Sequence, residues 1–171
     1  MNYQVLDNFL SEEDFFELEK GMINGDFPWY FNSAIVGGEL LEQEKKEPSK
    51  FQFVHSFYNE YGVNSGGFEL LSPILEKIGV QKLFRIKANL IPRTEEIIEH
   101  GFHTDYDPEK LKCLTAVFYL NTNDGYTIFA DGTKVESVAN RLLMFDSDLS
   151  HSGTSCTNEK IRVVINFNYR I

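Results

Sequence analysis

Two histidines and an aspartate are the residues whose types and spacing indicate chemistry in this chain. His103 and Asp105 stand two positions apart, and His151 follows them much later. Two imidazoles and one carboxylate on one face of an octahedral metal ion leave its other positions open for a co-substrate. Residues i and i+2 of a strand point to the same side, so a His-x-Asp pair can bind one ion. These three residues are candidate metal ligands.

A single arginine, Arg162, follows His151 by 11 residues inside an apolar run. A guanidinium buried there would bind the far end of a dicarboxylate through charge-assisted hydrogen bonds. This cation, together with the two histidines and the carboxylate, gives the pattern of non-haem Fe(II) oxygenases. Two plain alternatives stay open, because a lone His-x-Asp pair is most often a surface turn and Arg162 can be a structural ion-pair partner.

Length and composition indicate one domain with a real core. The chain has 171 residues, of which 42% are hydrophobic and 14% aromatic, and so many aromatic residues favour sheets over a helical bundle. The formal net charge of −10 argues against a nucleic-acid surface, since phosphate binding requires clustered Lys and Arg. No window approaches the roughly 18 apolar residues of a membrane span, so we expect no membrane partner.

The first residues and the two cysteines bear on the cellular compartment. Residues 1–6 lack a basic region followed by a long apolar segment, so we expect no signal peptide. Cys113 and Cys156 lie far apart and have no CxxC spacing, so we expect two reduced thiols. Both features predict a cytoplasmic protein.

The N-terminal half is expected to support the site. A short strand is predicted over 3–9 and a helix over 11–22, since its first residues, Ser-Glu-Glu-Asp, resemble a capping box. The polar stretch 37–50 is expected to be a loop. A second helical stretch is predicted over 68–78, with a Ser-Pro pair inside it and Gly79 at its end.

From residue 83 onward, short strands rich in β-branched and aromatic residues are expected, with Asn-Asp-Gly and Asp-Gly turns between them. About seven such strands after a more helical half predict an α+β fold, a double-sheet jelly roll buttressed by N-terminal helices. We expect a single domain over 1–171, with a support and lid region over 1–80 and the jelly-roll core over 83–171. The expected strands are 83–91, 97–104, 113–120, 126–130, 134–138, 141–145 and 161–169.

Two of these strands are expected to line a cavity, because polar residues recur on one face of each. On the last strand the residues of this face are Arg162, Val164, Asn166 and Asn168. On the strand over 113–120 they are Thr115, Val117 and Tyr119. The hydroxyl of Tyr119 could stand beside Arg162. His151 is expected in a loop after the strand over 141–145.

The order of His103, Asp105, His151 and Arg162 resembles that of the iron- and 2-oxoglutarate-dependent dioxygenases, specifically the prolyl-4-hydroxylase-like branch. The segments that also match are 5–11, 27–32, 115–121 and 141–146, and 27–32 resembles small members from bacteriophage and marine bacteria. The gap between His151 and Arg162 is longer than is common in the family. The resemblance implies a double-stranded β-helix, which is a jelly-roll or cupin-like core. It also implies the host cytoplasm if a phage encodes the chain.

Carried over residue by residue, the resemblance implies that His103, Asp105 and His151 hold Fe(II). Arg162 would bind the far carboxylate of 2-oxoglutarate, with Tyr119 as a hydroxyl donor to the same group. The other residues implied to line the co-substrate pocket are Thr115, Asn166, Asn168 and Asn89. Asn89 neighbours Ile91, which stands where the family often has a tyrosine. Dioxygen is the second co-substrate, and ascorbate is a candidate reductant.

The activity implied is oxidative decarboxylation of 2-oxoglutarate coupled to hydroxylation of a peptidyl or small-molecule substrate. Asp105 favours hydroxylation, because related halogenating enzymes leave its position free for halide. A non-catalytic, cupin-like metal-binding module, acting as a sensor or interaction module, is the alternative, and it would not require Arg162. A zinc hydrolase would accept the same ligands, but no general base is conspicuous beside them.

The remaining histidines and the lone tryptophan have plainer interpretations. His100 lies three residues before His103, so on a strand it would face the other side and have a structural or supporting role. His55 is expected to be a core or surface histidine, with contact to substrate as the alternative. Trp29 and its aromatic neighbours are expected to pack, with a lid over the site as the minor hypothesis.

Overall fold

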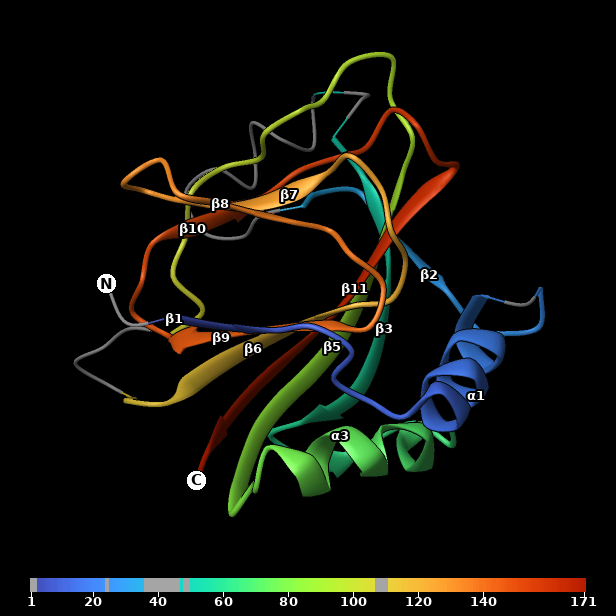
Figure 1. Ribbon diagram of the computed structural model, residues 1–171, viewed down its shortest axis with the longest axis vertical. Helices are drawn as coiled ribbons and strands as arrows, with labels where there is room; N and C mark the ends of the chain where they lie inside the picture. Colours follow the sequence, from blue (N-terminus) through green and yellow to red (C-terminus); the bar gives the residue numbers. More distant parts are fainter. Residues whose placement is uncertain (1–2, 24, 36–46, 48–49, 107–110) are drawn as a thin grey trace.

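Two antiparallel sheets face each other and form the frame of the protein (Figure 1). The computed structural model describes residues 3–23, 25–35, 47, 50–106 and 111–171. The strands are β1 (Tyr3–Leu6), β2 (Tyr30–Asn32), β3 (Gln52–Asn59), β4 (Gly62–Val63), β5 (Lys82–Pro92), β6 (Leu114–Tyr119), β7 (Tyr126–Phe129), β8 (Lys134–Glu136), β9 (Arg141–Asp146), β10 (His151–Gly153) and β11 (Ile161–Arg170). The large sheet has the order β1-β9-β6-β11-β5-β3-β2, with β4 paired to β3, and the small sheet has the order β10-β7-β8.

The helices lie against the outer face of the large sheet (Figure 1). They are α1 (Glu12–Ile23), the 3₁₀ turn η2 (Phe68–Leu71) and α3 (Ser72–Lys77). Ser11 caps α1 as predicted, since its Oγ accepts the N–H of Asp14 at 3.1 Å. Gly79 follows α3 with a φ of +67°, a left-handed conformation that glycine adopts without strain and that ends the helix. No helix in the described part of the chain is long and apolar enough to cross a membrane.

Alternating side chains of the large sheet build two separate cores. On β11, Val163, Ile165 and Phe167 face the helices, where they pack with Leu18 of α1 and Ile74 of α3. The other face of the large sheet and the inner face of the small sheet enclose a second cluster, which contains Val117, Tyr119, Phe129, Leu143, Phe145 and Val164. The alternation predicted for residues 113–120 and 161–169 is therefore confirmed, and it turns the polar positions of these strands toward the space between the sheets.

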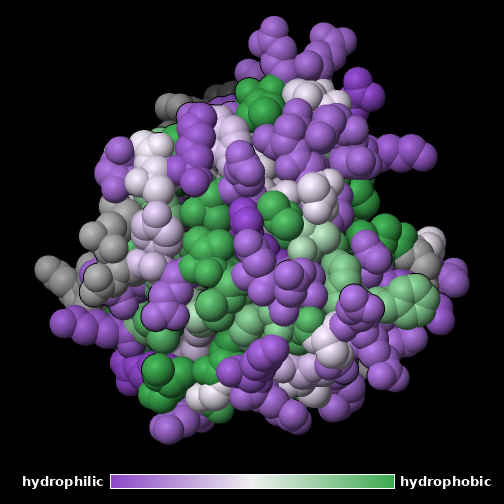
Figure 2. Space-filling model, in the orientation of Figure 1, coloured by the Kyte–Doolittle hydropathy of each residue, from purple (hydrophilic) through white to green (hydrophobic). Residues whose placement is uncertain are grey.

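The N-terminal half contributes more to the sheets than expected. β3 pairs with β5 over Phe53–Tyr58, and β1 pairs with β9, so strands from this half extend the large sheet on both sides. Most of the predicted loop over 37–50 lies outside the described residues. Figure 2 shows the same side of the molecule as Figure 1, with hydrophobic side chains gathered over the middle and hydrophilic ones around them.

The strand predicted over 97–104 is wrong. This segment meets β10 only through isolated bridges, Glu99 with Thr154 and His103 with His151. The N–H of His100 bonds the carbonyl of Gly153, and the N–H of His103 bonds that of His151. Between these two hydrogen bonds the chain advances three residues, from His100 to His103, while β10 advances only two, from His151 to Gly153. The extra residue interrupts a regular ladder. His151, expected in a loop, is the first residue of β10.

Asn140 joins the N-terminal segment to the large sheet. Its side-chain Oδ1 accepts the N–H of Leu10 at 2.8 Å, and its Nδ2 donates to the carbonyl of Leu10 at 3.0 Å. Asn140 is buried, and its φ of +60° lies in the left-handed region that asparagine tolerates better than most residues. The two hydrogen bonds and the backbone conformation together explain an asparagine at this turn.

We predict that Asn140→Ala lowers the free energy of unfolding by roughly 2–4 kcal/mol, because two buried backbone groups lose their partners. Urea denaturation followed by circular dichroism measures this change. Asn140→Gly is the matched control, since it loses the same hydrogen bonds but relieves the left-handed backbone, and it should be about 1 kcal/mol less destabilising. Wild-type stability in Asn140→Ala would show that the turn does not anchor the N-terminal segment.

Candidate metal centre and co-substrate pocket

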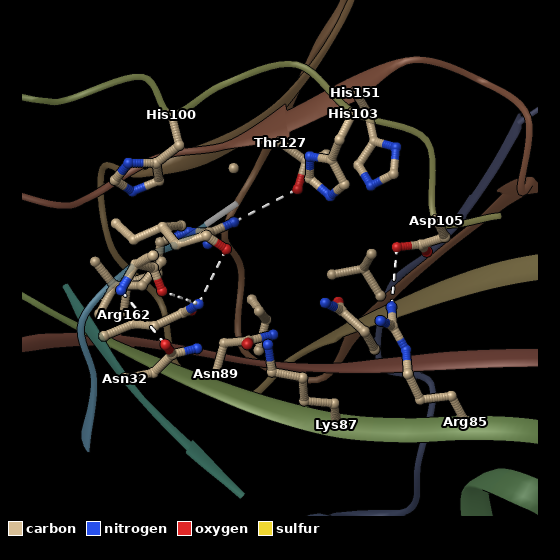
Figure 3. A pocket seen from close by; sticks show the side chains of 18 of the residues that line it. Asn32, Arg85, Lys87, Asn89, His100, His103, Asp105, Thr127, His151 and Arg162 are labelled. Carbon is tan, nitrogen blue, oxygen red and sulfur yellow. Dashed lines mark hydrogen bonds and ion pairs between the residues drawn. The ribbon is translucent and has the colours of Figure 1, made fainter. Parts of the chain in front are cut away.

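A cavity of about 620 Å³ opens between the two sheets (Figure 3). Its floor is the inner face of β5 and β11, and its roof is the segment around His103 together with β7 and β10. The site residues predicted from the sequence that line it are His103, Asp105, His151, Arg162, Asn166 and Asn89. Thr115, Tyr119 and Asn168, also predicted, do not line the cavity, and the structure gives each of them a different contact.

The three candidate metal ligands converge at one end of the cavity. One ligand atom from each of His103, Asp105 and His151 lies within 4.8 Å of the other two. The Nδ1 atoms of the histidines lie 3.2 Å from the carbonyl of Gly101 and 2.9 Å from that of Leu149. Because a carbonyl only accepts, each Nδ1 must carry the proton, which leaves both Nε2 lone pairs free for a metal.

The backbone fixes the two histidines relative to each other. The N–H of His103 bonds the carbonyl of His151 at 2.9 Å, and the N–H of His151 bonds that of His103 at 3.0 Å. Burial lowers the pKa of His151, so its imidazole is neutral, as a metal ligand must be. His103 and Asp105 therefore point to the same place, as predicted, although the regular strand on which that prediction was based is absent.

Asp105 is held by three side chains from the floor. Its Oδ1 accepts Arg85 Nη2 at 3.0 Å, and its Oδ2 accepts Thr115 Oγ1 and Asn168 Nδ2, both at 2.8 Å. Burial raises the pKa of this carboxyl, but the charge of Arg85 and the hydrogen bonds from Asn168 and Thr115 outweigh burial and lower it. Thr115 and Asn168, predicted to line the pocket, therefore orient a candidate metal ligand instead.

Arg162 is a buried cation at the opposite end of the cavity. Its side chain is 2% exposed, its Nε donates to Ser137 Oγ at 2.9 Å, and its Nη2 donates to Thr127 Oγ1 at 3.4 Å. Among the residues that the structure describes, no carboxylate forms an ion pair with it. Burial lowers the pKa of Arg162, yet a guanidinium keeps its charge in a protein. The site therefore favours an anionic ligand at this end.

Thr127 takes the position that the sequence had suggested for Tyr119. Tyr119 is fully buried, and its hydroxyl donates to Thr127 Oγ1 at 2.8 Å instead of reaching the cavity. Thr127 Oγ1 thus accepts from both Tyr119 and Arg162, which occupies both acceptor sites of a hydroxyl. Its own O–H remains available to a ligand in the cavity. Thr127 was missed because a lone threonine in an apolar strand carries no sequence signal.

Gly125 makes room for the arginine. A Cβ at this position would lie 2.7 Å from Arg162 Cδ and 2.5 Å from the carbonyl of Ser155. Neither group can retreat easily, because the carbonyl is backbone and the side chain of Arg162 is tethered to Ser137. The turn before β7 therefore requires glycine for close approach.

The two remaining histidines have different outcomes. His100, expected to face away from the site, lines the cavity, and neither of its ring nitrogens has a hydrogen-bond partner among the described residues. Burial, and then the charge of Arg162, lower the pKa of His100 to about 3, so it is neutral. His55 is a core histidine, as expected, because its ring nitrogens bond the carbonyl of Pro28 and the hydroxyl of Ser65.

The aromatic segment over 27–32 packs for the most part. Trp29 Nε1 donates to the carbonyl of Met22 at 3.3 Å, and the ring of Phe27 packs edge-on against Trp29 and at a tilt against His55. Tyr30 and Phe31 are exposed on β2, whose last residue, Asn32, reaches the cavity. Packing is thus confirmed for Trp29, and a lid role for the segment stays a prediction.

We predict that replacing threonine by valine weakens the binding of a different ligand at each end of the cavity. Thr115→Val removes a hydrogen bond to Asp105 and should weaken the affinity for Fe(II) roughly 10-fold, without a direct effect on a ligand at Arg162. Thr127→Val should leave metal affinity unchanged and weaken 2-oxoglutarate binding about 5-fold, the value of one hydrogen bond. Titration of each variant with Fe(II), and then of the metal-saturated protein with 2-oxoglutarate, measures both constants. Equal losses of both affinities in each variant would contradict the assignment of the two ends.

Comparison with known proteins gives one family and a consistent set of folds. Residues 95–170 match the model of the 2OG-Fe(II) oxygenase superfamily. A search of curated protein sequences finds no match. Because residues 95–170 contain the two histidines, the aspartate and the arginine of the cavity, the family match and the geometry concern the same part of the chain.

Solved structures of prolyl hydroxylases share the fold at low sequence identity. A prolyl hydroxylase from Trichoplax adhaerens, in complex with a hypoxia-inducible-factor peptide fragment, is 12% identical with a TM-score of 0.65, over 98% of this chain and 83% of that chain. A viral collagen prolyl hydroxylase from Paramecium Bursaria Chlorella virus-1, in complex with 2OG, is 15% identical with a TM-score of 0.61, over 100% and 97%. A Pseudomonas putida prolyl-4-hydroxylase is 16% identical with a TM-score of 0.58, over 99% and 92%. These matches confirm the predicted double-stranded β-helix.

Proposed function

We propose that this chain, whose residues 95–170 belong to the 2OG-Fe(II) oxygenase superfamily, hydroxylates a C–H bond of a peptidyl or small-molecule substrate. The family match and the metal-ligand cluster confirm the predicted enzyme class, a dioxygenase dependent on Fe(II) and 2-oxoglutarate. The observation that carries the proposal for this chain is the pairing of a three-ligand cluster with a buried, unpaired cation in one cavity.

The donor set fits Fe(II). We assign His103 Nε2, His151 Nε2 and a carboxylate oxygen of Asp105 as ligands, because both Nδ1 protons are engaged by carbonyls. When bound, Fe(II) would activate dioxygen for the oxidation of 2-oxoglutarate and of the substrate. The contribution of the protein is to hold the imidazole of His151 neutral and to keep Asp105 ionised through Arg85.

We assign the far carboxylate of 2-oxoglutarate to Arg162 and Thr127. The guanidinium brings a charge that no described carboxylate neutralises, and the hydroxyl of Thr127 has its proton free. The enclosed site strengthens these interactions because water does not compete. Fixing the tail of the co-substrate in this way would present its other end to the metal ligands in one orientation.

The two alternatives from the sequence account for less of the cavity. A non-catalytic metal-binding module leaves a buried cation without a purpose, because Arg162 makes no ion pair among the described residues. A zinc hydrolase requires a general base, and Asp105, already held by Arg85, is the one carboxylate among the described lining residues. Neither alternative explains the buried arginine and the metal ligands together.

The substrate and the location extend the proposal. The Trichoplax neighbour was solved with a peptide, and all three solved neighbours described above are prolyl hydroxylases, so peptidyl proline is the first substrate class to test. Such likeness shows fold alone, and the choice is an analogy. We propose a cytoplasmic location, which is supported by two free thiols, Cys113 and Cys156.

The decisive experiment adds Fe(II) and then 2-oxoglutarate without oxygen and follows the visible charge-transfer band that both together produce. Arg162→Met should raise the Kd for 2-oxoglutarate roughly 10- to 100-fold, since a hydrogen-bonded charge is lost. The matched control is Arg141→Met, because Arg141 pairs with exposed Asp7 and does not line the cavity. Metal binding without any band in the wild-type protein would refute the oxygenase and support the metal-binding module.

Turnover gives an independent readout. With oxygen, Fe(II) and 2-oxoglutarate, the wild-type protein should release succinate, and a chelator should abolish this release. His151→Ala should reduce succinate formation at least 100-fold, because two remaining ligands cannot hold the metal in place. Succinate formation that survives both the chelator and His151→Ala would contradict the assigned metal centre.

A further inference from the structure

The floor of the cavity carries more positive charge than the co-substrate requires. The charged residues among its described lining are Arg85, Lys87, Arg162 and Asp105, which gives three cations against one carboxylate. The whole chain has a formal net charge of −10, so the described lining of the cavity is opposite in sign to the chain as a whole. A cluster of cations in an acidic protein indicates that the cavity binds an anion.

Each cation except Lys87 is accounted for. Arg85 is paired with Asp105, and Arg162 has the far carboxylate of 2-oxoglutarate in the proposed function. The amine of Lys87 has no ion pair or hydrogen bond among the described residues, although the side chain is half-buried. Burial, and then the charge of Arg85, lower the pKa of Lys87 to about 8, so it is still mostly protonated at neutral pH.

Lys87 lies between the two ends of the cavity. On β5 it stands two residues from Arg85, at the metal end, and two residues from Asn89, which is roughly 7 Å in each direction. On β11 its partner across the ladder is Asn166. Figure 3 shows Lys87 rising from the floor, across the cavity from His103 and His151 on the roof. A molecule bound on the floor beside the metal would therefore meet this amine.

Two amides flank the amine. Asn89 and Asn166 both line the cavity, and the structure gives neither side chain a hydrogen bond within the described ranges. Asn89 is 7% exposed and lines the cavity, so its amide is available to a molecule bound there. An ammonium and two amide N–H₂ groups that converge on one space form a receptor for a carboxylate.

We propose that the substrate of this enzyme carries a carboxylate that Lys87, Asn89 and Asn166 bind on the cavity floor. The inference rests on the proposed function, because it takes the metal end and Arg162 to be occupied by 2-oxoglutarate. The reaction would then be limited to substrates whose reactive C–H bond stands at a fixed distance from an acidic group. Lys87 is a specificity residue in this scheme.

Two other uses of Lys87 are less satisfactory. Asp105 already accepts three hydrogen bonds, from Arg85, Thr115 and Asn168, so it does not need a fourth donor. In the proposed function, one carboxylate of 2-oxoglutarate binds the metal and the other binds Arg162, so neither needs Lys87. With Fe(II) and the doubly charged co-substrate both bound, the lining keeps its surplus of two positive charges. A substrate carboxylate is the group that would reduce it.

The test uses two pairs of probes that differ in charge and little else: N-acetyl-L-proline with N-acetyl-L-prolinamide, and isobutyrate with isobutyramide. Each probe is titrated into the oxygen-free complex of the protein with Fe(II) and 2-oxoglutarate, and the shift of the charge-transfer band gives its Kd. We expect the carboxylate of at least one pair to bind roughly 10-fold tighter than its amide, as one charge-assisted hydrogen bond requires. Lys87→Met should abolish this preference, and Lys87→Arg should retain most of it.

Lys82→Met is the matched control, because Lys82 lies on the same strand but outside the cavity. It should keep both the preference and the Kd for 2-oxoglutarate. The inference is overturned if amide and carboxylate bind equally or not at all, if a carboxylate only displaces 2-oxoglutarate, or if Lys87→Met weakens 2-oxoglutarate itself. Absence of the band in the wild-type protein before any probe is added would instead count against the proposed function.

Discussion

The constraint on which the rest of this structure depends is a buried guanidinium that pairs with no carboxylate of the described residues. Arg162 is 2% exposed, and hydroxyls from Ser137 and Thr127 are its only described hydrogen-bond partners. An uncompensated charge in a low-dielectric interior destabilises the fold unless something else neutralises it. In the proposed function, a dicarboxylate that reaches from the candidate metal ligands to Arg162 would neutralise this charge. The glycine at 125 and the packing of Tyr119 follow from the same requirement.

The sheets divide the work between their faces. The outward side chains of β6 and β11 pack against the helices, and this packing makes the inner face rigid enough to carry polar residues. On that inner face, Thr115 and Asn168 hold Asp105, while Arg85 neutralises it from β5. The candidate metal ligands come from the opposite side, near the edge of the small sheet. Asp105, from the roof, is therefore hydrogen-bonded to side chains of the large sheet. The position of a metal bound by Asp105 would depend on the distance between the two layers.

Much of this was predictable, because strict alternation in 161–169 and 113–120 identifies the inner face before any coordinates exist. The types and order of His103, Asp105 and His151 also identified them as candidate ligands, and the structure brings their ligand atoms within 4.8 Å of one another. What the sequence could not give was the partner of each polar group. Tyr119 has the right face for a ligand contact, but only three-dimensional packing turns its hydroxyl toward Thr127. On β5, Arg85, Lys87 and Asn89 alternate with apolar residues, but this pattern in the sequence does not by itself predict that they face a cavity.

The segment over 97–104 does not form a regular strand because it has one residue more than the part of β10 that it faces. Its single extra residue between His100 and His103, relative to β10, sets which way each of these two side chains turns. Removing one residue there would restore an even ladder and rotate every later side chain of the segment by half a period. Irregular connections usually accept insertions and deletions freely. The segment over 97–104 looks like a loop, but its length is fixed in the way that the length of a strand is. Its sequence can therefore change by substitution, but not by insertion or deletion.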